Sequence, residues 1–551
     1  MREFMVRNVK LSLLILSGAV GLVLLIACVN VANILLARAD VREREMALRI
    51  ALGAGRKRVV QQILNESVIL SLAGGALGVL FAVWGVHALV TTASVSYPLL
   101  KTASLDLPVL GFALLLSIFT GVLFGFVPGL KMAREGSSGV LWGSLKEGSH
   151  GASSGHASRR IHSLLVIFEV ALSLMLLLAA GLLLRSFMRL QEVNPGFDPR
   201  GVLTATITLP PGKYSTGPKR QALVQEFLQN LEHAPGVESA GVVDLLPLGG
   251  TNSGTQIYPE GRSLPRPGES PIVWLRFMSE HYFRAMSISL LSGRQFAESD
   301  NPPAPPVAII NRTLARRFWP GEDPLGKRFT MGPPGQGVPV FTVAGVAGDM
   351  HHTNLIQEPD AEMFLYYRQM PPGRVTVAVR TRLDPALMAN PVRQALSAAD
   401  KDLSVSRVMP MAQVLSDSIS PQRLTTLLFS IFAGIALILA AVGIYGVISY
   451  SVAQRRHEIG IRMALGSPKE RVFRMVAGEA MLLAVAGEIV GLAAALALRG
   501  LIDSQLYVSK ALDPLIFTCV PLVLAAVAFI AALIPALRAT KVDPLIALRS
   551  E

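Results

Sequence analysis

The chain has 551 residues, of which 51% are hydrophobic and only 16% are charged. A soluble globular domain usually has about 25% charged residues, so this composition excludes an ordinary soluble protein and favours a membrane protein. The net charge of +13 is carried by short basic clusters beside apolar segments, a pattern that marks cytoplasmic loops and argues against nucleic-acid binding.

The first apolar segment, residues 11–36, is long enough for the roughly 20 residues that cross a bilayer. An alternative is a secretory signal peptide, because Arg2, Arg7 and Lys10 precede the segment and Leu25–Cys28 resembles a lipoprotein cleavage box. Apolar sequence continues past this box, however, and the arginines after residue 36 would then lie outside the cytoplasm. The cysteines, Cys28 and Cys519, both fall in apolar segments, so we expect neither a disulfide framework nor a metal cluster.

Two more apolar segments, 63–90 and 107–130, complete a group of three spans within residues 1–134. Residues 135–160 are rich in Gly, Ser and His and predict a flexible cytoplasmic linker. A fourth span is predicted within residues 161–187, and it carries Glu169. We expect this carboxylate to face other helices or to stay near the interface, and no second acidic residue or histidine accompanies it in the apolar segment 164–184 to form an ion relay.

Residues 188–423 have the character of a water-soluble α/β domain. Strand–helix–strand patterns at 201–244 and 374–408 bracket a middle region, 247–366, that contains further strand patterns. This order predicts split βαβ units with an inserted β-rich lobe.

Three last spans lie within residues 424–551. When the spans are counted against the basic clusters, the prediction is an α-helical membrane protein of about seven transmembrane helices with an extracytoplasmic α/β domain. The same count places the amino terminus outside and the carboxyl terminus in the cytoplasm.

One stretch of the sequence occurs twice. Glu45–Ala54 returns as Glu458–Ser467, and the same offset aligns Glu66 with Glu479 in the apolar segments that follow. A constant offset across several elements indicates an internal repeat.

Each copy of the repeated stretch predicts a short helix with an apolar stripe and a charged stripe. A glutamate and an arginine four residues apart can pair, and the following glycine can end the helix in the left-handed conformation. Two interpretations stay open, an ordinary interfacial helix with solvated charges and a helix that docks into a partner. The residues concerned are Glu45, Arg49, Gly53, Glu458, Arg462 and Gly466.

The two copies resemble the motif of MacB/FtsX-like permeases of ATP-binding-cassette (ABC) systems. Tyr282–Met286, Ser292–Phe296 and Asn311–Glu322 resemble the outer domain of the duplicated, ADOP-type members of that family. The resemblance implies that 1–134 and 424–551 are FtsX-like permease halves and that 188–423 is a MacB-like periplasmic core domain. It also implies that the first transmembrane helix and first periplasmic domain of the duplicated pattern are lacking.

The resemblance further implies a function and a set of partners. The six residues of the repeated stretch would couple the permease to a cytoplasmic ABC ATPase subunit, which drives a periplasmic domain for efflux or mechanotransmission in the bacterial inner membrane. Membrane lipid is a further partner, and the pattern is compatible with a periplasmic or outer-membrane partner and with a homodimer or pseudo-dimer. The alternative is a non-transporting regulator of envelope enzymes. An ion-driven secondary transporter is disfavoured, because ionisable residues in the middle of the spans are few. They are Glu169 and Glu488, which have no evident partner in the sequence.

The sequence predicts no catalytic site, no cofactor and no metal site. Gly321–Arg328 has the glycine and lysine spacing of a phosphate-binding loop, but Arg328 stands where a magnesium-binding Ser or Thr is needed, so we expect a turn. The pair His351–His352 is too small a set of ligands to close a zinc shell.

Overall fold

The structure is a computed structural model that describes residues 13–36, 56–93, 106–135, 152–262, 271–335, 337–500 and 513–541. The chain divides into two compact units. Residues 1–189 and 423–551 form the first, which we call the membrane unit, and residues 190–422 form the second, which we call the α/β domain. Each unit is described by itself.

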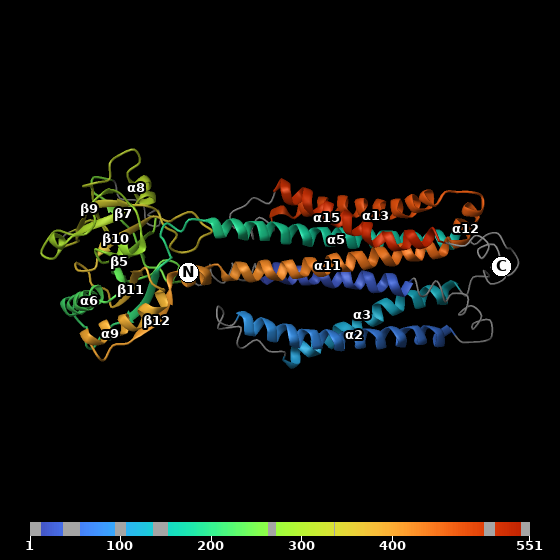
Figure 1. Cartoon of the computed structure of the whole chain (residues 1–551), viewed down its shortest axis with the longest axis horizontal. Coiled ribbons are helices and arrows are strands. Elements are labelled where there is room, and N and C mark those ends of the chain that lie inside the picture. The colour runs from blue at the N-terminus through green and yellow to red at the C-terminus, as the bar shows by residue number, and fades with distance from the viewer. Residues whose placement is uncertain are drawn as a thin grey trace. The chain divides into compact units, whose positions relative to one another are not determined.

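The membrane unit consists of long helices that run side by side (Figure 1). Six helices among the described residues are long and apolar enough to cross a membrane, as judged by length and composition, and a shorter apolar helix, Leu107–Leu123, begins α3. Each predicted span therefore corresponds to a helix. The described helices of this unit are Leu13–Leu36, α2 (Arg56–Ala93), α3 (Leu107–Glu135), α5 (Ala152–Glu192), α11 (Ser420–Gln454), α12 (Arg456–Ala464), α13 (Lys469–Ala497) and α15 (Pro514–Ala539).

The predicted linker differs from the structure in its last part. Helix α5 already begins at Ala152, so residues 152–160 are helical. No proline interrupts this stretch, and the helix of the fourth span can therefore extend through it. Residues 136–151 of the predicted linker lie outside the described residues.

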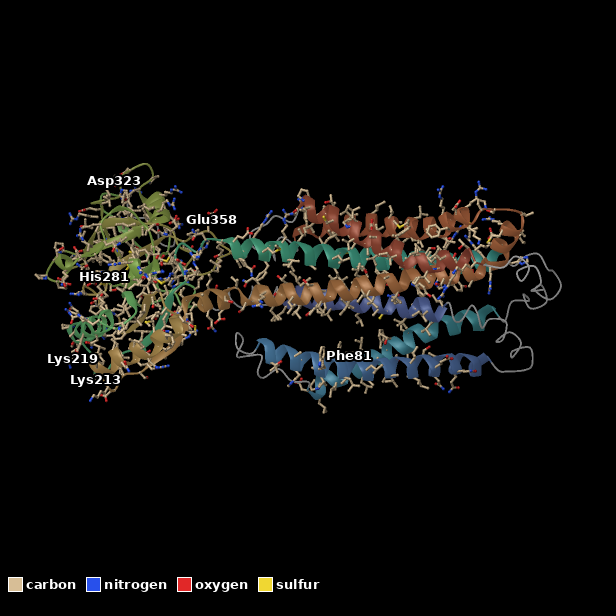
Figure 2. All side chains as sticks on the ribbon, in the orientation of Figure 1. Phe81, Lys213, Lys219, His281, Asp323 and Glu358 are labelled. Carbon is tan, nitrogen blue, oxygen red and sulfur yellow. The ribbon has the colours of Figure 1, made fainter. Side chains whose placement is uncertain are left out.

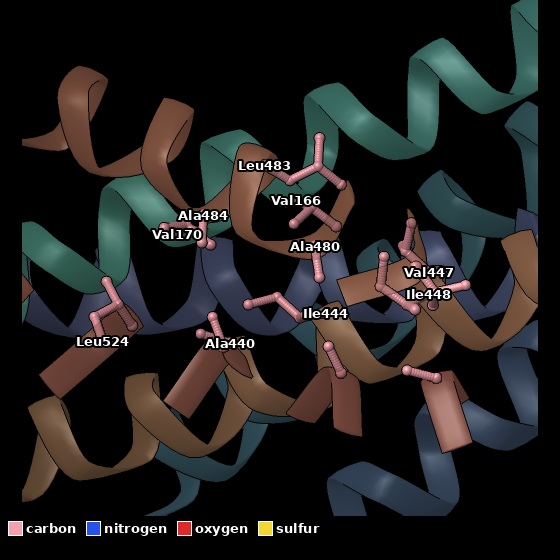
Figure 3. Packing of buried hydrophobic residues seen from close by; sticks show 14 of the residues in the cluster. Val166, Val170, Ala440, Ile444, Val447, Ile448, Ala480, Leu483, Ala484 and Leu524 are labelled. Atoms are coloured by element: carbon pink, nitrogen blue, oxygen red, sulfur yellow. The ribbon is translucent and has the colours of Figure 1, made fainter. Parts of the chain in front are cut away.

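Helices α5, α11, α13 and α15 share one hydrophobic core, in which Val170 of α5, Ala440 of α11 and Ala484 of α13 are buried (Figure 3). Small residues allow this close packing, as is usual between helices in lipid. A Cβ atom at Gly487 of α13 would lie 2.8 Å from the Ile167 carbonyl oxygen, and one at Gly491 would lie 2.7 Å from that of Ala171. The two glycines therefore bring α13 directly onto the backbone of α5.

Helices α2 and α3 pack on each other as a hairpin, again through small residues. A Cβ atom at Gly75 of α2 would lie 3.1 Å from Cβ of Ser117 on α3, and a Cβ atom at Gly121 of α3 would lie 3.1 Å from Cα of Val68. Much of the remaining surface is apolar and exposed, as at Phe81 on α2 (Figure 2). Such a surface suits contact with lipid.

The α/β domain is built on one sheet. Twelve strands of the described residues join it, and ten of them form the order β12-β1-β11-β2-β5-β10-β7-β9-β8-β4, with β3 beside β5 and β6 beside β9. The strands are β1 (Val202–Thr208), β2 (Val237–Val243), β3 (Gly254–Thr255), β4 (Tyr258–Pro259), β5 (Val273–Met278), β6 (Leu290–Gly293), β7 (Val307–Asn311), β8 (Arg328–Thr330), β9 (Val340–Ala347), β10 (Glu362–Tyr366), β11 (Arg374–Thr381) and β12 (Val405–Pro410).

The two predicted βαβ units are present, and they interlock. The first is β1-α6-β2, with α6 at Gly217–Glu232, and the second is β11-α9-β12, with α9 at Ala389–Ala399. Strand β1 lies between β11 and β12 and is antiparallel to both, so each unit completes the sheet of the other. Shorter helices α7 (Tyr282–Met286), α8 (Arg312–Phe318) and α10 (Met411–Ser418) complete the domain.

The inserted region continues the sheet rather than forming a second one. The link between the two parts is the pair Val243 of β2 and Met278 of β5. The insert has its own hydrophobic core, in which Phe329 and Phe341 stack with their ring centroids 5.8 Å apart. The predicted β-rich lobe is therefore distinct in its core but continuous in its backbone hydrogen bonding.

A buried charged cluster lies within the insert. The Arg276 guanidinium is fully buried, and its Nε lies 3.1 Å from Oε1 of Glu362 and 3.2 Å from Nδ1 of His352. Burial lowers the pKa of the His352 imidazole, and the nearby Glu362 carboxylate only partly offsets this effect. Nδ1 of His352 also lies 3.1 Å from Oε1 of Glu362, so the imidazole is held between the guanidinium and the carboxylate. His352 is thus part of an ion-pair cluster of the core.

Candidate coupling site

The first copy of the repeated stretch, with Glu45, Arg49 and Gly53, lies outside the described residues. The second copy is described and forms α12, a short helix between the long helices α11 and α13. Glu458 lies in its first turn and Arg462 in its last turn, so each charge is at the end of the helix dipole that stabilises it.

The end of α12 has the geometry that the sequence predicts. Gly466 has a φ of +87°, in the left-handed region that glycine adopts without strain. The amide of Ser467 donates to the Arg462 carbonyl at 3.0 Å, and the amide of Gly466 donates to the Met463 carbonyl at 3.1 Å. These two bonds make a Schellman motif, which ends the helix sharply and fixes the direction of the chain after it.

The predicted pair within α12 is formed. Nη2 of Arg462 lies 2.6 Å from Oε1 of Glu458, and both side chains are about half exposed. An exposed pair at this spacing contributes about 0.3–0.5 kcal/mol, so it stiffens the helix without dominating its stability. Nη1 of the same arginine also lies 3.1 Å from the sulfur of Met475 on α13.

Two further contacts hold α12 against the membrane unit. Ile459 is 1% exposed and belongs to the hydrophobic core shared by α5, α11, α13 and α15. Arg455, at the amino-terminal cap of α12, places Nη1 3.4 Å from Oε2 of Glu479 on α13. Apolar packing at Ile459 and the ionic contact of Arg455 therefore hold α12 against the core and against α13.

The outer face of α12 combines apolar and basic side chains. Leu465 is 83% exposed and Ile461 is 37% exposed, and the exposed Arg456 and His457 lie on the same helix. The predicted apolar stripe is thus divided, with Ile459 in the core and these two side chains on the surface. The exposed surface of α12 is therefore mixed, with two apolar side chains near two basic ones.

Sequence reasoning missed Arg455 and Leu465 as members of this site. In the sequence, the repetition of Glu66 as Glu479 is the available signal for a role of this residue. The partner of Glu479 could not be inferred, because the contact depends on how α12 folds back onto α13.

The other candidates for chemistry do not form a site. The segment Gly321–Arg328 is a turn of the α/β domain, where Asp323 (Figure 2) accepts a hydrogen bond from the Leu325 amide at 3.0 Å. Among the described residues, no group of three His, Cys, Asp or Glu side chains could hold a metal ion. A cavity of about 250 Å³ in the same domain is lined by polar side chains that include threonines, Asp244, Asp417, Arg374 and Arg407.

Two known protein families match this chain. The model of the FtsX-like permease C-terminal family matches residues 17–136 and again 430–544, and the MacB-like periplasmic core domain matches residues 163–399 between them. The macrolide export ATP-binding/permease protein MacB of Azoarcus sp. (strain BH72) is 28% identical over 291 residues, which cover 50% of this chain and 42% of that protein. The chain belongs to the MacB/FtsX-like ABC permeases.

A second curated protein and a solved structure are also similar to this chain. The pyoverdine export ATP-binding/permease protein PvdT of Pseudomonas entomophila (strain L48) is 25% identical over 379 residues, covering 64% of this chain and 56% of that protein. The crystallised periplasmic region of MacB from Actinobacillus actinomycetemcomitans is 15% identical, with a TM-score of 0.28, and covers 41% of this chain and 96% of that structure. The permease spans about half the length of the curated relatives or less.

The two matches to the FtsX-like model agree with the internal repeat, since they contain the two copies of the repeated stretch. With its long apolar helices, this permease is a multi-pass protein of the inner membrane. The domain boundaries that the sequence suggests stay predictions.

Proposed function

We propose that this permease serves an ABC exporter in which a cytoplasmic ATPase subunit acts on α12 and on its twin around Glu45 and Arg49. The observation that supports this proposal most directly is the construction of α12. It is sharply capped at Gly466, anchored at Ile459 and Arg455, and exposed at Leu465. A rigid, anchored and exposed element is suited to receive a push from a partner.

Two continuous helices would carry the displacement to the α/β domain. Helix α11 runs from Ser420 to Gln454, just before α12, and α5 runs from Ala152 to Glu192. The α/β domain comprises residues 190–422, so both helices connect in sequence to its ends. Their shared core with α13 would move them together, because packed helices shift between discrete arrangements rather than deform.

The proposal includes a sidedness. Basic clusters follow the positive-inside bias when α12 and the carboxyl terminus are cytoplasmic and the α/β domain is periplasmic. The amino terminus of the given sequence is then outside. The match of the domain to a family described as periplasmic supports the same arrangement.

The partner would be an ATP-binding subunit, which in the relatives MacB and PvdT is named together with the permease. The relatives are named for export of macrolides and pyoverdine. A macrolide is therefore a reasonable first probe of export by this permease.

The experiment is co-purification with the ATPase subunit and measurement of permease-stimulated ATP turnover for the double variant Arg49→Glu plus Arg462→Glu. We expect loss of stimulation, because the basic charges that would meet the partner are reversed. Arg200→Glu is the control for net charge, since Arg200 is highly exposed and belongs to the α/β domain. Unchanged stimulation in the double variant would contradict the proposal.

The alternative, a non-transporting regulator of envelope enzymes, makes a different prediction. A pulldown with the full chain would recover a cell-wall enzyme, while deletion of the gene would leave macrolide export unaffected.

A further inference from the structure

A polar contact joins three helices in the core of the membrane unit. Asn30 of the Leu13–Leu36 helix donates through Nδ2 to Oε1 of Glu169 on α5, and also to the Leu439 carbonyl of α11 at 3.1 Å. Glu169 is fully buried and Asn30 is 4% exposed. Polar groups in such a setting are costly unless they are partnered, so the contact ties the three helices at one level.

Gly443 of α11 provides the space for the Glu169 carboxyl group. A Cβ atom at Gly443 would lie 2.7 Å from Cδ of Glu169, closer than such atoms can approach. Gly434 and Gly446 on the same helix have nothing within 4 Å of the corresponding position. The close approach is therefore specific to Gly443.

Neighbouring contacts follow the same face of α5. Nδ1 of His162 lies 3.2 Å from Oδ1 of Asn33 on the first described helix, and the His162 ring lies 5.1 Å from that of Tyr450 on α11. Ser173 donates to the Ala436 carbonyl of α11 at 3.2 Å. His162, Glu169 and Ser173 are spaced by seven and four residues, which places them on one helical stripe.

The internal repeat relates the two sides of this contact. Asn30 and Gly443 are separated by the same number of positions as Glu45 and Glu458, so they are equivalent residues of the two halves. One half supplies the amide donor, and the other supplies the space. The Glu169 carboxyl group of α5 therefore meets an amide donor from one half and a glycine from the other, because the two halves differ at this position.

We propose that Asn30, Glu169, Gly443 and the Leu439 carbonyl form a latch that fixes the register of the first half against the α5–α11 pair. The latch makes the two halves of the membrane unit move as one body. Glu169 is a positioning residue in this arrangement. Only the effect of the latch on turnover depends on the proposed ATPase coupling.

The test uses the full chain in detergent and follows its thermal unfolding midpoint. Gly443→Ala should lower the midpoint by about 2–4 °C, whereas the matched Gly446→Ala variant should not. In a Glu169→Ala background, Gly443→Ala should not lower the midpoint further, because the carboxyl group that the new methyl would displace is absent. Equal effects of Gly443→Ala with and without the carboxyl group would overturn the latch.

Conservative replacement separates a hydrogen-bonding role from a requirement for charge. Glu169→Gln keeps the acceptor for Asn30 and should unfold at the wild-type midpoint. Glu169→Leu removes the acceptor and should lower the midpoint. If the Gln variant is as impaired as the Leu variant, the latch is wrong and the charge itself is needed.

The role in motion is tested by permease-stimulated ATP turnover. At a temperature where Glu169→Leu is folded, we expect at least a tenfold loss of stimulation, with Glu169→Gln close to wild type. Full stimulation in the Leu variant would overturn the joint movement of the halves. If the wild-type chain itself gives no stimulation, the proposed function fails, while the thermal comparison of the Gly443 variants still decides the latch.

Discussion

Arg455 and Glu479 join the cap of α12 to α13, with Nη1 of the arginine 3.4 Å from Oε2 of the glutamate. Both side chains are partly exposed, so the pair should add no more than about 1 kcal/mol to stability. Its larger effect should be mechanical, because it is the ionic contact that anchors α12. We therefore expect Arg455→Gln and Glu479→Gln to reduce ATPase coupling while leaving the protein folded.

The charge swap is the control for this pair. Arg455→Glu combined with Glu479→Arg restores the attraction in reverse and should recover part of the ATP turnover that each single change removes. A double variant no better than the single variants would show that attraction between the two residues is not what matters.

The second prediction concerns the cap at Gly466. Its φ of +87° costs about 1–2 kcal/mol for a residue with a side chain, so Gly466→Ala should destabilise the α12 end by that amount. No heavy atom lies within 4 Å of the added methyl, so the cost would come from the backbone alone. Hydrogen exchange of the Leu465 and Gly466 amides in the full chain measures the effect.

Gly478 is a matched control for that measurement. It lies inside α13, and an added methyl there also meets nothing within 4 Å. Gly478→Ala should be neutral or stabilising by up to about 1 kcal/mol, because alanine is the better helix former. Equal losses of protection for the two variants would contradict the role of the left-handed cap.

The third prediction concerns the α2–α3 hairpin. Gly75→Ala and Gly121→Ala each place a methyl group against the facing helix, and Gly121→Ala would meet the Val68 backbone at 3.1 Å. Each should weaken the hairpin, as small residues are what permit close packing in lipid. Susceptibility to protease in the segment between the two helices is the measurement.

Gly74 and Gly78 supply the controls, because an added methyl at either position meets nothing within 4 Å in the described structure. Gly74→Ala and Gly78→Ala should therefore leave the cleavage rate unchanged. Faster cleavage for these two variants as well would contradict the packing seen at Gly75 and Gly121.

The fourth prediction concerns pH. Burial lowers the pKa of His352 below its ordinary value of 6.5 in the folded domain, while the unfolded chain keeps the ordinary value. The unfolded state therefore binds a proton first, and stability is lost as the pH falls below about 6.5. Arg276, Glu362 and Asp360 are the charged groups that act on this imidazole.

Thermal unfolding of the α/β domain, followed in the full chain, should show this acid sensitivity as the pH falls below about 6.5. His352→Asn removes the titrating group and should flatten the dependence in that range, even if the midpoint itself falls. If the pH dependence of the midpoint persists unchanged in the variant, another titrating group causes it.

Local patterns in the sequence were sufficient for individual elements. The alternation at 201–209 predicts β1, and the glycine after the charged pair predicts the left-handed cap at Gly466, because both depend on neighbouring residues. The position of β1 between β11 and β12 could not be predicted in this way, since it requires pairing between strands far apart in the chain.

Glu169 illustrates the same limit within the membrane unit. The sequence correctly predicts that it faces other helices, because an isolated carboxylate in lipid is too costly. Its partner Asn30 was missed because it lies on a helix distant in sequence. His162 was missed because α5 extends beyond the apolar segment that defines the predicted span, and the histidine lies on that extension.

The adjacency of β1 and β12 has an evolutionary consequence. These are the first and last strands of the α/β domain, and Leu203 of one pairs with Pro410 of the other. A domain that starts and finishes on neighbouring strands is a cassette, which recombination can remove or transplant in one piece while the lipid-embedded scaffold remains intact.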